Sequence, residues 1–195
     1  AIHIAKASPL LMFTTAVMGY FLTYEKTFLL LLIGFCGNTI INYLIKHAIM
    51  KPLMGDRRYP IIGQGPRPKG ATSCGLFEKS KITDIKSFGM PSGHAQMAGF
   101  FTAYSMSKLG EDKVSLPFYV TVGSILSSCL IFIMYSRVYS KCHTIQQTVA
   151  GCIIGLVFGN IFFNNLTWSS VSIIVKLEFN PTAEACFLKS FAQIE

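Results

Sequence analysis

The chain has 195 residues, of which 51% are hydrophobic and only 13% are charged, and its formal net charge is +8. This length favours one domain, and the charged share is well below the roughly 25% of an average soluble domain. The composition therefore argues against an ordinary soluble protein. A soluble all-helical core would need polar helix faces, which these segments mostly lack.

Five apolar blocks follow one another along the chain, and each approaches the roughly 20 residues that a helix needs to cross a bilayer. The expected spans lie near residues 8–24, 27–49, 91–108, 115–136 and 143–165. The first is too far from a small-residue cleavage site to be a signal peptide. The blocks predict an all-α fold, a polytopic membrane helix bundle of about five spanning helices within a domain of residues 1–165, with an active site at one membrane face.

The one long connection, residues 50–90, is rich in Gly, Pro and basic residues, and its prolines argue against a long helix there. Together with the amino terminus, Lys46 at the end of the second span and the turn 137–142, it places 12 basic and 3 acidic residues on one side of the membrane. The positive-inside rule would put this side in the cytoplasm. A basic face that binds an anionic substrate would give no such orientation. No nucleic-acid partner is expected, because no nucleic-acid-binding module accompanies these residues.

The last span and the tail differ in their periodicity. Gly151, Gly155 and Gly159 recur every four residues, a spacing that lets another helix approach closely within a membrane. In the tail, residues 166–195, the apolar side chains between 171 and 179 alternate with mostly polar ones, which is the period of a strand. We expect a strand-like or interfacial tail, a protein partner bound through residues 167–180, or a short sixth helix.

Six cysteines are scattered along the chain, mostly inside the expected spans and without the spacing of a metal site. They are interpreted as small apolar residues rather than as a set of disulfides. Cys74 and Cys142 could meet on one face, and the sequence does not decide whether they do.

Three polar clusters fall at one expected membrane face. They are the basic loop with Lys46, Lys51, Arg58 and Arg67, the run PSGH at 91–94, and the run SRVYSKCHTIQQ at 136–147. Guanidinium groups bind phosphate oxygens through paired hydrogen bonds, so Arg67 and Arg137 are candidate phosphate ligands.

The run PSGH is suited to an anion site at the start of a helix. Pro91 fits the first helical turn, where its missing N–H costs nothing. Ser92 and Gly93 would then present free backbone N–H groups at the positive helix end, with His94 nearby.

His143 and Gln147 are four residues apart and therefore share a helix face. The Gln147 oxygen can accept a hydrogen bond from one ring nitrogen of His143, which leaves the other nitrogen unprotonated. Such an imidazole can attack phosphorus, and His94 can protonate the departing oxygen.

These motifs, in this order, resemble those of the type 2 phosphatidic acid phosphatase and vanadium haloperoxidase superfamily, whose members carry K-x6-R-P, P-S-G-H and S-R-x5-H-x3-D. Pro91–His94 matches the second motif completely, and Ser136, Arg137 and His143 match the third. The resemblance runs from about residue 42 to about residue 159. It implies an all-helical core, a phosphohistidine intermediate and no required metal or cofactor.

The first motif is broken. Lys51 lies seven residues before Arg58, but Tyr59 stands where the motif has Pro, whereas Arg67–Pro68 is too far from any lysine. We expect an insertion in the loop, with Lys46 and Arg67 as the motif residues. The competing assignment is Lys51 with Arg58.

The second departure is Gln147, which replaces the final Asp of the third motif. The runs GMPSGHAQ and HTIQQTVAG resemble the dolichyldiphosphatase branch, which also has Gln at this position. This resemblance implies a polyprenyl diphosphate substrate and a catalytic face in the lumen of the endoplasmic reticulum, or of a membrane derived from it.

The expected function is therefore that of an integral membrane lipid phosphatase. Its catalytic residues would be His143, His94 and Gln147, and its phosphate ligands Lys46, Arg67, Ser92, Gly93 and Arg137. One alternative is a phosphatidate-type lipid phosphatase or a lipid phosphotransferase. Another is an inactive family member with a structural role in a viral or organellar membrane assembly.

Overall fold

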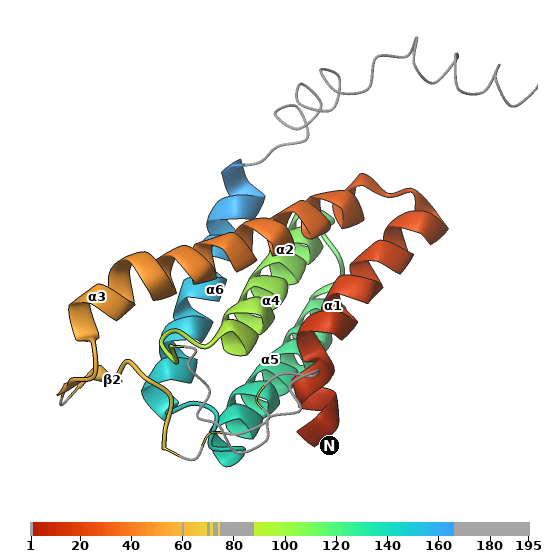
Figure 1. Cartoon of the computed structure of the whole chain (residues 1–195). Coiled ribbons are helices and arrows are strands. Elements are labelled where there is room, and N and C mark those ends of the chain that lie inside the picture. Colours follow the sequence, from red (N-terminus) through yellow and green to blue (C-terminus); the bar gives the residue numbers. More distant parts are fainter. Residues whose placement is uncertain (1, 60, 70, 72–73, 75–87, 166–195) are drawn as a thin grey trace, which may run out of the picture. The chain divides into compact units, whose positions relative to one another are not determined.

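The computed structural model describes residues 2–59, 61–69, 71, 74 and 88–165. Five long helices account for most of these residues (Figure 1). They are α1 (Ile2–Thr23), α2 (Lys26–Leu44), α4 (Gly93–Glu111), α5 (Leu116–Tyr139) and α6 (Ile145–Asn165). The predicted all-α membrane bundle is confirmed, whereas the expected strand-like tail and its partner site at 167–180 lie outside the described residues.

Two of the expected spans are longer than their apolar blocks. Helix α1 begins well before residue 8 and contains Pro9, which cannot donate a backbone hydrogen bond to the Ala5 carbonyl. The Ser8 hydroxyl donates to that carbonyl instead, at 2.9 Å. Helix α2 continues through a π-helical turn, η1 (Ile45–Met50), into the short helix α3 (Lys51–Met54). The continuous helix formed by α2, η1 and α3 therefore extends beyond residue 49 into the expected loop.

A small hairpin follows α3 and was not predicted from the sequence. Strands β1 (Arg58–Tyr59) and β2 (Gly63–Gln64) pair antiparallel, with Arg58 opposite Gln64 and Tyr59 opposite Gly63. A two-residue strand is too short to show the alternation of apolar and polar residues by which strands are recognised in a sequence. The hairpin matters because it leads directly into the segment that carries Arg67.

Within the part of the chain that the structure describes, four helical segments are long and apolar enough to cross a membrane. They are His3–Thr23, Lys26–Met54, Leu116–Tyr139 and Ile145–Asn165. Helix α4, the expected third span, does not meet this criterion, although its 19 residues extend about 28 Å, close to the thickness of a bilayer core. It packs against α1, α2 and α5. Because protein rather than lipid covers α4, this helix can carry polar residues without exposing them to hydrocarbon.

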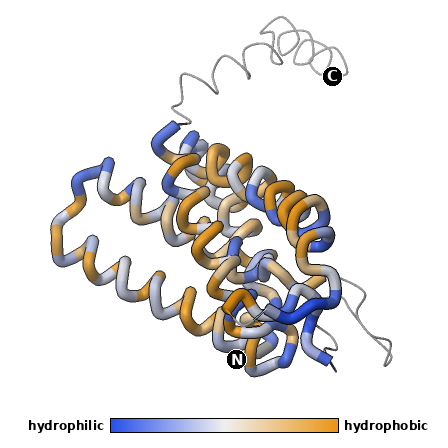
Figure 2. Tube along the Cα trace, turned by 90° about the vertical axis from the view of Figure 1, so that its left-hand side faces the viewer, coloured by the Kyte–Doolittle hydropathy of each residue, from blue (hydrophilic) through white to orange (hydrophobic). Residues whose placement is uncertain are grey.

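The outward faces of the other helices are strongly apolar. Leu22, Ile40, Ile131 and Ile153 are among the large side chains that are more than half exposed. Figure 2 shows hydrophobic residues along the middle of the helices and hydrophilic residues mainly at their ends. An exposed apolar surface of this extent is a surface for lipid. The protein is therefore an integral membrane protein.

Close packing of α6 on α4 depends on the glycines that the sequence analysis identified. A Cβ at Gly151 would collide with the backbone carbonyl of Ser92, and one at Gly155 would collide with that of Gln96. At Gly159, it would lie 2.7 Å from the Phe100 carbonyl. These contacts confirm the predicted packing role of the three glycines.

A polar network joins α2 to α4 within the bundle. The Gln96 amide nitrogen donates to the backbone and side-chain oxygens of Asn38, at 3.1 and 3.0 Å. Asn42 in turn donates to the Gln96 side-chain oxygen at 2.7 Å. Because Lys46 lies one turn beyond Asn42, this network fixes the end of α2 against the start of α4.

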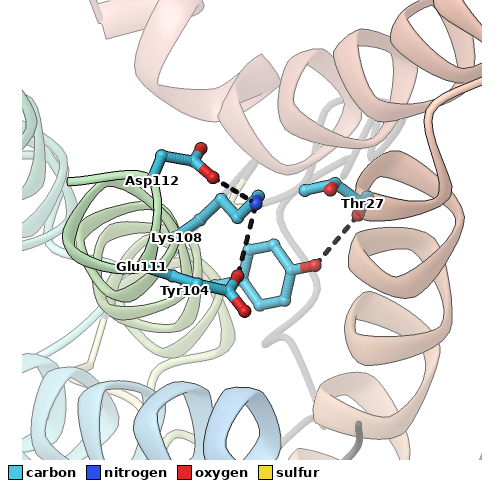
Figure 3. Close-up of polar contacts among 5 residues, drawn as sticks. All are labelled: Thr27, Tyr104, Lys108, Glu111 and Asp112. Atoms are coloured by element: carbon cyan, nitrogen blue, oxygen red, sulfur yellow. Dashed lines mark hydrogen bonds and ion pairs between the residues drawn. The ribbon is translucent and has the colours of Figure 1, made fainter. Parts of the chain in front are cut away.

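The opposite end of α4 is attached to α2 by a different contact (Figure 3). The Tyr104 hydroxyl donates to the Thr27 carbonyl at 2.9 Å. One turn farther along, Lys108 pairs with Glu111 and Asp112. Helix α4 is thus fastened at both ends, which holds its first turn in place at the polar face described below.

Gly155→Ala should destabilise the protein, because the new methyl group meets the Gln96 backbone carbonyl, which cannot move without displacing α4. Overpacking of this kind costs about 1–3 kcal/mol. Gly110→Ala is the matched control, since nothing lies within 4 Å of a Cβ there and alanine favours a helix. The measurement is thermal unfolding in detergent. Equal melting temperatures for the two variants would contradict this account of the α4–α6 contact.

Candidate active site

The site lies where five segments converge at one face of the bundle. These are the start of α1, the π-helical turn η1 after α2, the segment after β2, the start of α4, and the turn between α5 and α6 (Figure 1). Hydrogen bonds join the other four segments, and Lys46 of η1 acts on the site through its charge. All three predicted polar clusters therefore meet, although they are separated by up to about 100 residues in the chain.

Gln147 orients His143 and caps α6. Helix α6 begins at Ile145, so His143 lies in the turn before the helix rather than in its first turn. The Gln147 Oε1 atom lies 3.1 Å from His143 Nδ1 and accepts the Thr144 backbone N–H at 3.2 Å. The Gln147 backbone N–H donates back to the Thr144 hydroxyl at 3.3 Å. Thr144 and Gln147 thus form a capping box.

The capping box explains why His143 keeps a fixed ring orientation. Because Gln147 Oε1 accepts from two donors, Nδ1 carries the proton and Nε2 is left with its lone pair. Thr144 was missed by the sequence analysis, although the spacing T-x-x-Q immediately before an apolar helix is the signal that would have found it.

The same Gln147 side chain holds the loop that carries Arg67. Its amide nitrogen donates to the carbonyls of Gln64 and Pro66, at 2.7 and 2.8 Å. Gly89 packs so closely that a Cβ there would lie 2.7 Å from this nitrogen. An aspartate could accept from His143 but could not donate to the loop carbonyls. A Gln at this position can therefore hydrogen-bond both to His143 and to the loop.

A disulfide joins the loop to the histidine turn. Cys74 and Cys142 are bonded, with Cα atoms 5.6 Å apart, and both residues are buried. The cysteines as a set were interpreted as unbridged apolar residues, but this pair was left open, and the structure shows it as a disulfide. The two residues are 68 positions apart in the chain, so their expected place on one membrane face allowed the contact but did not establish it.

Both arginines that the sequence analysis selected lie at this junction. Arg137 is almost fully buried at the end of α5, and its guanidinium donates to the Cys74 carbonyl at 2.5 Å. Arg67 donates to the Cys142 carbonyl at 3.4 Å. Each guanidinium is thereby held beside His143.

Of the two assignments of the first motif, the geometry favours Lys46 with Arg67. The charges of Lys46 and Arg67 both act on the His143 ring. Lys51 and Arg58 are instead exposed on α3 and β1. The π-helical turn η1 contains Lys46, and turns of this type are often found at functional sites.

The PSGH segment differs from expectation in two respects. Helix α4 begins at Gly93, so Pro91 precedes it instead of lying in its first turn. The Ser92 backbone N–H donates to the Gln147 carbonyl at 3.0 Å and is not available to an anion. Gln96 makes the first helical hydrogen bond, to the Ser92 carbonyl, so the amides of Gly93 and His94 are the ones at the helix end.

The side chains of Ser92 and His94 in this segment differ in their hydrogen bonds. The Ser92 hydroxyl is buried and makes no hydrogen bond within the described part of the chain. His94 Nε2 lies 3.2 Å from the Lys6 carbonyl of α1. A carbonyl only accepts, so Nε2 carries a proton and Nδ1 is the nitrogen that can exchange one.

The electrostatics of the site suit a neutral histidine and an anionic ligand. Burial, followed by the positive charges of Arg67, Arg137 and Lys46, lowers the pKa of His143, and the hydrogen bond to Gln147 opposes this only in part. His143 is therefore unprotonated at neutral pH. Among the described residues, no three His, Cys, Asp or Glu side chains are placed to hold a metal ion.

Comparison with known proteins places the chain in a family. A family model described as the PAP2 superfamily matches residues 27–170. The chain belongs to the PAP2 superfamily. The match begins after α1, so the helix whose Lys6 carbonyl contacts His94 lies outside the part that the PAP2 model covers.

A solved structure shares the PAP2 fold. It is the crystal structure of the first transmembrane PAP2 type phosphatidylglycerolphosphate phosphatase from Bacillus subtilis, with a TM-score of 0.57 and 22% sequence identity. The alignment covers 84% of this chain and 71% of that one. No curated protein matches the sequence. This likeness confirms a membrane-embedded PAP2 helix bundle.

If the PAP2 site binds phosphate, Arg67→Ala should reduce kcat/KM roughly tenfold to hundredfold, because a hydrogen bond to a charged group is worth about 1.5–3 kcal/mol. Arg58→Ala removes the same charge from an exposed position and should leave kcat/KM nearly unchanged. Steady-state kinetics of the two purified variants give the ranking. A larger loss of kcat/KM in Arg58→Ala than in Arg67→Ala would show that Lys51 and Arg58 are the residues of the first motif.

Gln147→Leu should reduce activity on the order of tenfold to hundredfold, because it leaves buried polar groups unpaired at about 1–3 kcal/mol each. Gln147→Glu keeps an acceptor for His143 but turns oxygen lone pairs toward the carbonyls of Gln64 and Pro66. It should raise KM by displacing Arg67. Measuring kcat and KM for both variants tests whether Gln147 holds both His143 and the loop. A KM equal to that of wild type in Gln147→Glu would contradict the role in holding the loop.

Proposed function

We propose that this protein is an integral membrane lipid phosphatase that hydrolyses a polyprenyl, dolichyl-type diphosphate through a phosphohistidine intermediate. The observation that carries the proposal is the His143 ring. Its Nδ1 atom is bonded to Gln147, its Nε2 atom is left with a lone pair, and the three cations Lys46, Arg67 and Arg137 act on it.

In the first half of the reaction, Lys46, Arg67 and Arg137 bind the oxygens of the terminal phosphoryl group, and the Gly93 amide adds a donor at the helix end. His143 Nε2 attacks phosphorus, so that an N–P bond forms while the bridging P–O bond breaks. The bound phosphate raises the proton affinity of His94, whose imidazolium then donates a proton to the leaving oxygen.

In the second half, water attacks the phosphohistidine. His94, now neutral, accepts a proton from this water, the N–P bond breaks, and inorganic phosphate leaves. His143 returns to its starting form with Nδ1 still bonded to Gln147. The net reaction consumes one water and yields a lipid monophosphate and inorganic phosphate, and no step requires a metal ion.

The lipid nature of the substrate is supported by where the site lies. The reacting residues sit at the polar end of a bundle whose outer surface is apolar, so a substrate embedded in the membrane can present its head group to them. The diphosphate is supported by Gln147 and by the runs GMPSGHAQ and HTIQQTVAG, which resemble the dolichyldiphosphatase branch. A phosphatidate-type phosphatase and a phosphotransferase are the competing activities.

For the membrane orientation, we propose that the catalytic face lies in an oxidising compartment such as the endoplasmic reticulum lumen. The Cys74–Cys142 bond supports this, because disulfides persist there and are rare in the cytosol. The excess of basic residues on the same face is then explained by binding of an anionic substrate. It is not a mark of the cytoplasmic side.

The test is phosphate release by purified protein in detergent from polyprenyl diphosphate, phosphatidate and phosphatidylglycerophosphate, with and without EDTA. We expect release from the diphosphate to be fastest, to persist in EDTA, and to be abolished by His143→Ala. The control is His47→Ala, which removes an exposed histidine from η1.

Activity of His143→Ala within about tenfold of wild type, equivalent to about 1.4 kcal/mol in the barrier, would exclude His143 as the nucleophile. Faster release from phosphatidate would replace the diphosphate assignment. Loss of activity in EDTA that Mg²⁺ restores would refute the proposed chemistry. Release from none of the lipids would favour a structural role in a membrane assembly.

A further inference from the structure

Each cysteine of the Cys74–Cys142 disulfide accepts a hydrogen bond from one of the two arginines of the site. The Cys74 carbonyl accepts a hydrogen bond from Arg137, which belongs to α5 near Cys142. The Cys142 carbonyl accepts one from Arg67, which belongs to the loop near Cys74. Each bridged residue therefore binds the arginine that comes from the other segment.

Backbone hydrogen bonds also connect His143 and Cys142 to Arg137. The backbone N–H groups of Cys142 and His143 both donate to the Arg137 carbonyl, at 3.1 and 3.2 Å. The turn that carries His143 is thus folded onto the end of α5 beside the disulfide. A displacement of Cys142 would move the acceptor of Arg67 and the backbone of His143 together.

Attachments on both sides of Arg67 along the chain hold the loop at this place. One is the pair of hydrogen bonds from Gln147 to the carbonyls of Gln64 and Pro66, which precede Arg67. The other is the disulfide, which follows Arg67 at Cys74. Like-charged Arg67, Arg137 and Lys46 repel one another, so holding them around one point requires a constraint that does not itself depend on charge.

We propose that the Cys74–Cys142 disulfide is a positioning element that sets Arg67 and Arg137 at the distance required to bind one phosphoryl group. The proposal rests on the proposed function, because it assigns both guanidinium groups to the same phosphate. Reduction of the bond frees the carbonyl acceptors to separate, and the repelling arginines then move apart. The main consequence is weaker binding of phosphate, with a smaller effect on the chemical step at His143.

The test compares wild type with Cys74→Ser and with protein reduced by dithiothreitol. The control is Cys36→Ser, which removes an exposed, unbridged cysteine of α2. Cys74 is chosen because it is distant in sequence from His143, whereas Cys142 is its neighbour. The oxidation state of the pair is read by mass spectrometry after alkylation, and binding of inorganic phosphate is measured by calorimetry in detergent.

We expect Cys74→Ser and reduction each to weaken phosphate binding about tenfold or more and to raise KM more than they lower kcat. Reduction should have no further effect on Cys74→Ser, and Cys36→Ser should bind phosphate like wild type. A disulfide that only stabilises the fold would lower the melting temperature but leave phosphate affinity and KM unchanged below it. That outcome would overturn the proposal, as would full alkylation of both cysteines in unreduced protein.

Two of these measurements do not depend on turnover. If wild type released phosphate from none of the lipids, but reduction still weakened binding of inorganic phosphate, the positioning role would stand and the proposed hydrolysis would fail. If hydrolysis occurred and reduction changed neither phosphate affinity nor KM, only the positioning role would fail.

Discussion

The side-chain amide of Gln147 connects the two halves of the site, and the other features depend on that connection. Its oxygen accepts from His143 and Thr144, and its nitrogen donates to the carbonyls of Gln64 and Pro66. Only an amide offers an acceptor and two donors on one rigid plane. The orientation of the histidine and the place of the loop are therefore set by a single residue. This gives a physical reason for Gln at a position where the superfamily motif has Asp.

The membrane imposes the second constraint, because polar groups within it must be satisfied by protein. Helix α4, which carries Gly93 and His94, is covered by other helices, and Gln96 finds its partners on α2. The glycines of α6 bring that helix close enough for the Gln147 carbonyl to accept the Ser92 N–H. The geometry at the polar end thus depends on how the helices pack, and a change in the helix contacts would also move the site.

The sequence was sufficient for features that depend on local pattern. Apolar blocks located the five long helices to within a few residues at most ends, and the four-residue spacing placed Gln147 beside His143. Features set by tertiary contact were beyond it. The pairing of Cys74 with Cys142 joins distant segments, and the use of the Ser92 N–H by the Gln147 carbonyl follows from the approach of α6 to α4. The continuation of α2 through the π-helical turn η1, which contains Lys46, into α3, which contains Lys51, was not predicted either.

The central claim is that His143 becomes phosphorylated during turnover. The most direct measurement is to mix the protein with substrate labelled in its terminal phosphoryl group, quench within milliseconds in alkali, and locate the label by mass spectrometry. We expect a phosphoryl group on His143 that is stable in alkali and lost in acid. We also expect the label to disappear when the substrate is exhausted. Rapid turnover with no label on His143, or with label on another residue, would contradict the account.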